Sequence, residues 1–90
     1  MCRNIKPLFN FEPPANDEEV RASALQFVRK VSGFNRPSQA NEAAFNHAVE
    51  EVTRVTRELI ASLVTVAPPK DREVEAARAK ERSIRRFGVA

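Results

Sequence analysis

Apolar residues recur at helical spacing in three stretches of the chain, each bounded by residues that start or stop helices. The first helix is predicted over residues 17–32. Asn16 and Glu19 have the spacing of a capping box, in which both side chains satisfy free N–H groups at a helix start. Gly33 follows the last turn, where glycine commonly ends a helix. The apolar face of this helix consists of Val20, Ala24, Phe27, Val28 and Val31.

The longest helix is predicted over residues 39–65, between Ser38 as its N-cap and the Pro68-Pro69 pair. Its apolar positions alternate steps of four and three, as in a heptad seam. They are Phe45, Val49, Val52, Thr56, Leu59 and Leu63. At 1.5 Å per residue this helix is about 39 Å long and the first about 24 Å, so one partner helix leaves part of the seam uncovered. We expect other parts of the chain, or a second copy in a symmetric dimer, to cover the rest.

The two ends of the chain differ from this central pair of helices. Residues 1–15 contain three prolines and no helical periodicity, so they are expected to form an extended arm that packs on the helices. A third helix is predicted over residues 72–87, with Asp71 as its N-cap. Glu81 interrupts its apolar stripe, so we expect the basic segment 70–90 to be mobile unless a partner orders it. The sequence thus predicts an all-α fold in a single domain over residues 1–90.

Composition narrows the class of protein. A chain of 90 residues fills one hydrophobic core, and 42% hydrophobic with 30% charged residues is typical of a globular protein. No apolar run approaches the roughly 20 residues of a membrane helix, and no secretory signal is recognisable at the N-terminus. The single cysteine excludes an internal disulfide and agrees with a reducing compartment. These features favour a soluble cytoplasmic protein without membrane contact.

Several motifs occur in a recognisable order along nearly the whole chain. They are Met1-Cys2-Arg3-Asn4-Ile5, Phe11-Glu12-Pro13-Pro14-Ala15, Arg29-Lys30-Val31-Ser32-Gly33, Pro37-Ser38 with Asn41-Glu42-Ala43-Ala44-Phe45, and Ala67-Pro68-Pro69. Together they resemble the domain of unknown function 2277 family of small bacterial proteins. The resemblance implies a bacterial, cytoplasmic, stand-alone domain with no established activity. It therefore assigns no catalytic or binding residue.

Candidate reactive residues are few. Removal of Met1 would leave Cys2 with an amine and a thiol that can chelate a metal or act as a nucleophile, and Arg3 and Lys6 would favour the thiolate. The alternative is a small, buried, apolar cysteine. His47 is the only histidine, and a metal site needs three or four ligands, so Cys2 with His47 is a weak candidate beside a surface histidine. No nucleophile motif is present, so an enzyme is disfavoured and no cofactor or small-molecule ligand is expected.

The net charge of +3 arises after residue 64, where seven basic and four acidic side chains lie. Five of the basic residues form a candidate nucleic-acid-binding cluster on the third helix: Arg78, Lys80, Arg82, Arg85 and Arg86. Such a cluster predicts salt-sensitive, sequence-independent attraction to phosphates, and its alternative is an ordinary solvated helix face. The leading hypothesis is a non-enzymatic helical module that forms a homodimer or binds another protein. Nucleic-acid association through the third helix is second, and a thiol or metal function at Cys2 is third.

Overall fold

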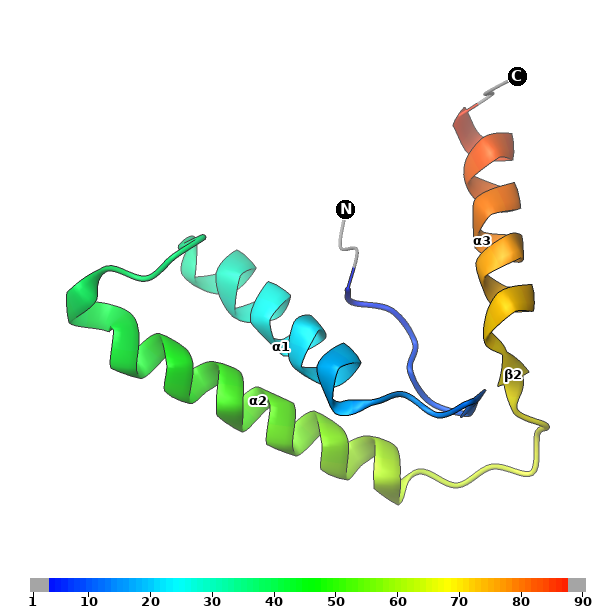
Figure 1. Ribbon diagram of the computed structural model, residues 1–90, viewed down its shortest axis with the longest axis horizontal. Coiled ribbons are helices and arrows are strands. Elements are labelled where there is room, and N and C mark those ends of the chain that lie inside the picture. Colours follow the sequence, from blue (N-terminus) through cyan, green and yellow to red (C-terminus); the bar gives the residue numbers. More distant parts are fainter. Residues whose placement is uncertain (1–3, 88–90) are drawn as a thin grey trace.

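The computed structural model describes residues 4–87 and contains three helices and two short strands in that range. In chain order the elements are β1 (Phe11–Glu12), α1 (Asp17–Ser32), the 3-10 turn η1 (Gln39–Asn41), α2 (Glu42–Ser62), β2 (Lys70–Asp71) and α3 (Arg72–Phe87). α1 and α2 lie side by side as an antiparallel hairpin, and α3 stands apart from them (Figure 1). The predicted mainly helical fold is confirmed, with a two-stranded ladder that the sequence pattern did not indicate.

The predicted boundaries of α1 and α3 are confirmed because local capping contacts determine them. The backbone N–H of Glu19 donates to Asn16 Oδ1 at 2.8 Å, and that of Asn16 donates to Glu19 Oε1 at 3.1 Å. Gly33 has the left-handed conformation, with φ 80°, and its N–H donates to the Arg29 carbonyl at 2.9 Å. At the start of α3, Val74 N–H donates to Asp71 Oδ1 at 3.0 Å.

The boundaries predicted for the second helix, 39–65, were wrong at both ends. Its first turn is a 3-10 turn, in which the Asn41 amide side chain donates to Ser38 Oγ at 2.8 Å. The helix ends at Ser62, three residues before the expected position, and Leu63 is extended with ψ 144°. Residues 64–66 are β-branched and exposed, so neither propensity nor burial favours another turn. The Thr65 hydroxyl instead accepts from Ala67 N–H at 3.0 Å.

A small core lies between α1 and α2. Val20, Ala24 and Val28 of α1 and Phe45 and Val49 of α2 are its buried apolar residues within the described part of the chain. A buried polar residue that the sequence pattern missed, Thr53, continues this line, and its hydroxyl donates to the Val49 carbonyl at 2.6 Å.

The predicted heptad seam is therefore only partly buried. Val52 and Thr56 are half-buried, whereas Leu59 and Leu63 are 55% and 43% exposed. Arg57 contacts Asp17, the first residue of α1, across 3.3 Å. Because α2 continues past this point, its last residues extend beyond the start of α1 and have no partner helix there.

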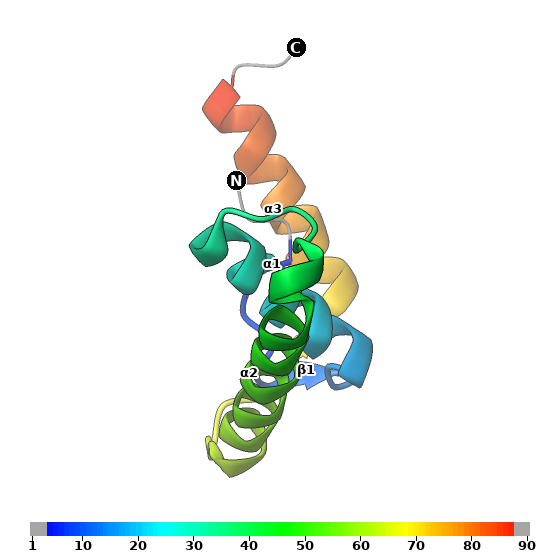
Figure 2. The same ribbon diagram turned by 90° about the vertical axis from the view of Figure 1, so that its left-hand side faces the viewer.

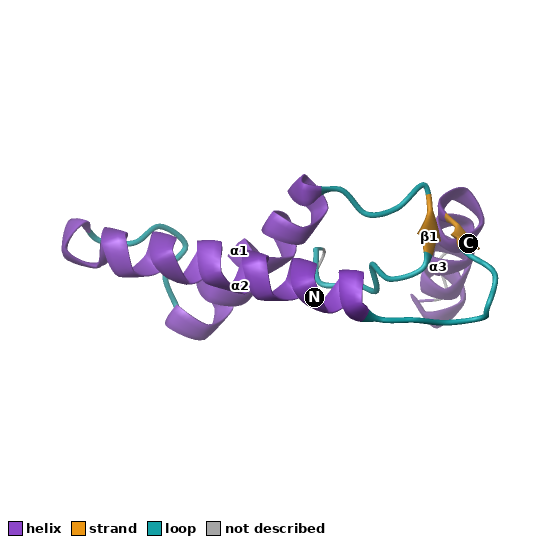
Figure 3. Cartoon of the chain, turned by 90° about the horizontal axis from the view of Figure 1, so that it is seen from below, coloured by secondary structure: helices purple, strands orange, loops and turns teal. Residues whose placement is uncertain are grey.

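The arm connects the hairpin to α3, as the view from below shows (Figure 3). β1 pairs in parallel with β2, with Phe11 opposite Lys70 and Glu12 opposite Asp71. Asn10, whose φ is 65°, accepts through its carbonyl from Lys70 N–H at 2.8 Å. Its side-chain amide donates to the Pro68 carbonyl at 3.1 Å. The arm is extended, as predicted, and it also holds the segment that leads into α3.

The molecule is flat, with principal extents of 45, 37 and 15 Å. Figure 2 shows it edge on, with α3 rising away from α2. Its radius of gyration is 15.9 Å, compared with about 12 Å for a compact chain of this length. No helix within residues 4–87 has an apolar stretch long enough to cross a membrane.

The position of the core predicts that two valines of α2 contribute very differently to the free energy of unfolding. Val49 is 1% exposed and Val55 is 53% exposed. Val49→Ala should lower the free energy of unfolding by about 2 kcal/mol, because it removes two buried carbon atoms and leaves a cavity. Val55→Ala should change it by less than about 0.5 kcal/mol. Urea unfolding followed by far-UV circular dichroism measures both, and equal effects would show that this core assignment is incorrect.

Candidate functional site

The α1–α2 hairpin has two unlike sides. One side carries two exposed ion pairs between the helices, Arg21–Glu50 at 3.7 Å and Arg57–Asp17 at 3.3 Å. At 3.6 residues per turn, Phe27 and Leu59 lie on the other side of the core. That side, called the front face here, presents apolar residues of the arm, α1, the connector after α1, and α2. They include Ile5, Phe27, Val31, Phe34, Val52, Leu59 and Leu63.

Two adjoining hollows form the front face. The first, of about 320 Å³, lies between the end of α1 and the start of α2 and has no charged residue in its lining. The second, of about 330 Å³, lies between the arm and the later turns of α2, and Lys6 is its one charged lining residue. Both hollows include Phe27 and Val52, so they form a continuous apolar groove.

Large side chains of the front face are strongly exposed for apolar residues. Phe27 is 48% exposed, Leu59 55% and Val31 70%. Single exposed apolar side chains are ordinary, but a continuous apolar surface marks an interaction site. The front face is therefore the first candidate functional site.

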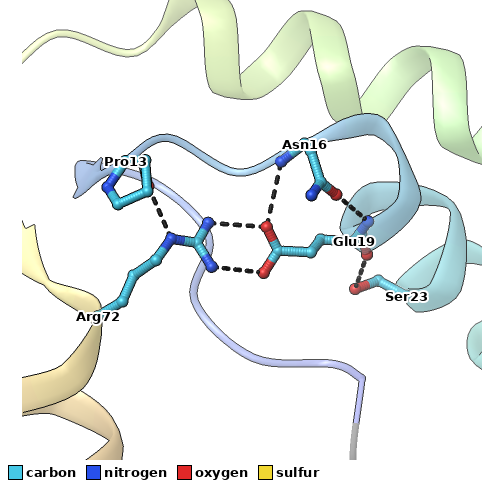
Figure 4. Close-up of polar contacts among 5 residues, drawn as sticks. All are labelled: Pro13, Asn16, Glu19, Ser23 and Arg72. Carbon is cyan, nitrogen blue, oxygen red and sulfur yellow. Dashed lines mark hydrogen bonds and ion pairs between the residues drawn. The ribbon is translucent and has the colours of Figure 1, made fainter.

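A second cluster joins the arm, α1 and α3 through one guanidinium group (Figure 4). Arg72 donates from Nη1 and Nη2 to the two carboxylate oxygens of Glu19, at 2.8 and 2.7 Å. Its Nε donates to the Pro13 carbonyl at 2.7 Å. The hydrogen bonds from Arg72, together with the N–H of Asn16, lower the pKa of Glu19 to about 2 despite the opposing effect of its partial burial. One carboxylate thus serves both the capping box and the junction with α3.

The arm is also held along α1. The backbone N–H of Asn4 donates to Gln26 Oε1 at 2.7 Å, and the Ser23 hydroxyl donates to the Asn4 carbonyl. Between the arm and α3 lies a hollow of about 460 Å³, called here the arm–α3 hollow. Its charged lining residues are Lys6, Lys70, Arg72 and Arg82 with Glu19 and Glu75.

Two members of the predicted basic cluster have carboxylate partners within α3. Arg78 contacts Glu75 at 3.5 Å and Arg85 contacts Glu81 at 2.9 Å, so both are paired within α3. Helical spacing places Lys80 on the opposite side of α3 from Arg82. Arg82 lines the arm–α3 hollow. The side chain of Arg86 lies outside the described part of the chain.

The other predicted site residues are Cys2 and His47. Cys2 lies outside the described residues, and His47 is exposed on α2. Among the described residues, no three His, Cys, Asp or Glu side chains are grouped to hold a metal ion. Sequence reasoning missed Lys70, Arg72 and Phe11 as site residues, because only the pairing of β1 with β2 brings them next to one another.

The geometry defines a small helical-hairpin protein with an arm and a third helix joined by an ion pair. The chain belongs to the family described as uncharacterized conserved protein, DUF2277, whose model matches residues 1–78. No curated protein and no solved structure matches it. The match includes both Glu19 and Arg72, and it ends at Arg78 within α3.

The ion pair between Arg72 and Glu19, called the junction here, predicts that the free energy of unfolding depends on pH. The pKa of Glu19 is about 2 in the folded protein and about 4.3 in an unfolded chain. The ion pair therefore stabilises fully above roughly pH 5 and loses its effect as the pH falls towards 2. Glu19→Gln should lower the free energy of unfolding by about 1–2 kcal/mol at neutral pH, allowing for solvent screening, and by much less near pH 2. Urea unfolding at both pH values measures this.

The exposed Glu18 of the same helical turn provides the control. Glu18→Gln should change the free energy of unfolding little at either pH, because no ion pair of Glu18 occurs among the described residues. If Glu19→Gln lowers the free energy of unfolding as much near pH 2 as at neutral pH, the charge of the carboxylate does not stabilise the junction.

The pairing within α3 also sets an expectation for nucleic acid. Because Arg78 and Arg85 are each paired with a carboxylate within α3, binding to duplex DNA should be weak and vanish near physiological salt. The plot of log affinity against log salt should be shallower than the slope of about −4.5 per chain that all five predicted cations would give if each neutralised one phosphate. Fluorescence anisotropy of labelled duplex DNA measures this slope. Submicromolar binding at physiological salt, abolished by Arg82→Glu together with Arg85→Glu, would contradict it.

Proposed function

We propose that the protein is a homodimeric helical interaction module whose two copies pack front face against front face. The observation that carries the proposal is the continuous apolar groove on one side of the α1–α2 hairpin. Two antiparallel hairpins stacked in this way make a four-helix bundle, in which each copy covers the seam of the other. Such an interface is isologous, because the same surface serves both copies.

The small size of the core supports the proposal that a second copy adds buried apolar surface. Five apolar residues are buried within the described part of the chain, and a core this small contributes limited stability. Full burial of a large apolar side chain contributes about 1.5–3 kcal/mol, so covering a half-exposed Phe27 or Leu59 adds about half of that. A second copy adds this at several positions at once.

The charged residues at the edges of the front face favour a second copy of the chain, and not an unrelated protein, as the binding partner. By helical spacing, Lys30 lies at the outer edge of the front face on α1, and Glu51 and Glu58 lie at its outer edge on α2, where both carboxylates accept from Arg54. A twofold axis that sets α1 of one copy beside α2 of the other brings Lys30 near a cluster that has one more carboxylate than guanidinium. The groove between these edges is almost free of charge, which matches another copy of itself.

We also infer that the dimer works in the bacterial cytoplasm. The single cysteine and the family resemblance described above support this location.

Sedimentation across a range of concentrations tests the dimer. The protein should sediment as a dimer at micromolar concentration, and Leu59→Asp should convert it to a monomer by placing a charge in the apolar interface. Ala61→Asp is the matched control, because Ala61 is exposed two residues away and lies off the front face by helical spacing. It should leave the dimer intact. Circular dichroism checks that both variants keep their helix content.

Two results would contradict the proposal. One is a wild-type protein that stays monomeric up to the highest concentration measured. The other is equal dissociation by Leu59→Asp and Ala61→Asp, which would place the contact elsewhere.

A further inference from the structure

We propose that the arm–α3 hollow binds a small phosphorylated molecule that carries a flat aromatic group. The hollow measures about 460 Å³, within the range of roughly 300–1,000 Å³ of ligand pockets. Parts of the chain that are distant in sequence form it: the arm from Lys6 to Phe11, Glu19 of α1, and the continuous segment of β2 and α3. It lies on the other side of the arm from the front-face groove, and Lys6 and Leu8 take part in both linings. This inference does not depend on the dimer.

The charges of the hollow favour an anion. Arg72 is fully engaged by Glu19 and Pro13, and Glu75 pairs with Arg78. Three cations remain in the lining: Lys6, Lys70 and Arg82. In the described part of the chain none of these three has a carboxylate within 4.0 Å. A phosphate monoester carries a charge of about −1.5 to −2 at neutral pH and several acceptor oxygens, so it can engage more than one of them.

The rest of the lining favours an aromatic group next to that anion. Lys70 Nζ lies 5.6 Å from the centre of the Phe11 ring, and the guanidinium carbon of Arg72 lies 5.8 Å from it. Ala76 and Ala79 of α3 face the same hollow with small apolar side chains. A phosphate bound to Lys70 therefore places the body of its molecule beside an aromatic ring and an apolar helix surface.

The hollow is formed before a ligand arrives. The Arg72–Glu19 pair and the β1–β2 ladder fix α3 relative to the arm. Binding then needs little ordering of the chain, which lowers its entropic cost.

A fluorescent analogue of adenosine monophosphate is the probe. The chain has no tryptophan or tyrosine, so emission of the probe is read without protein background. Anisotropy titration of the full chain should give saturable binding. Arg82→Glu should weaken it about tenfold or more through loss and reversal of a charge in the hollow. Lys80→Glu makes the same change on the opposite side of α3 and should alter the affinity less than about twofold.

Competition tests the two parts of the ligand. Unlabelled adenosine monophosphate should displace the probe, inorganic phosphate should do so only at much higher concentration, and adenosine should fail. Arg82→Lys should retain most of the binding, which separates loss of charge from loss of fold.

Three results would overturn the proposal. They are no saturable binding up to millimolar probe, an equal loss for Arg82→Glu and Lys80→Glu, and displacement by adenosine as strong as that by adenosine monophosphate.

Discussion

The bidentate pair between Arg72 and Glu19 is the contact on which the arrangement of this protein depends. The two residues are 53 positions apart, and they bring α3 to the start of α1. The other link to α3 is a ladder of two-residue strands, which has little stability alone. Because Glu19 also accepts from the N–H of Asn16, one carboxylate caps the start of α1 and positions α3. The third hydrogen bond of Arg72, to Pro13, adds the arm to the same junction.

The one-sided burial of the hairpin follows from the unequal lengths of its helices. α1 has 16 residues and α2 has 21, so the later turns of α2 find no helix opposite them. The arm passes there and half-buries Leu8 and Phe9, but Leu59 and Leu63 stay exposed. Exposed ion pairs occupy the other side and contribute little to stability. The chain therefore has its exposed ion pairs on one side and its exposed apolar surface on the other, as the proposed association through one face requires.

Short sequence motifs were sufficient to predict the helix ends that are determined by contacts within a few residues. The capping box at Asn16, Gly33 and the cap at Asp71 predicted the bounds of α1 and α3, because each forms within a few residues. The seam of α2 was predicted only in part, since periodicity cannot tell how far a partner helix extends. The junction was not predicted at all. Nothing near Arg72 or Asn10 in the sequence indicates a contact more than 50 residues away, and two-residue strands have no period to detect.

The basic residues of α3 illustrate why a charge count is a poor guide to a binding surface. Five cations within nine positions look like one cluster, but Lys80 lies on the opposite side of α3 from Arg82, and Arg78 and Arg85 each contact a carboxylate one turn away. Arg82 instead lies in one hollow with Lys6 and Lys70, which come from the arm and β2. The arm separates this hollow from the front face and is held at both ends, by Gln26 at Asn4 and by Lys70 at Asn10. Coupling between two sites needs an element that can take two arrangements. An arm held at these two points has a single arrangement in this structure. The proposed association through the front face and the proposed anion binding beside α3 can therefore be tested independently.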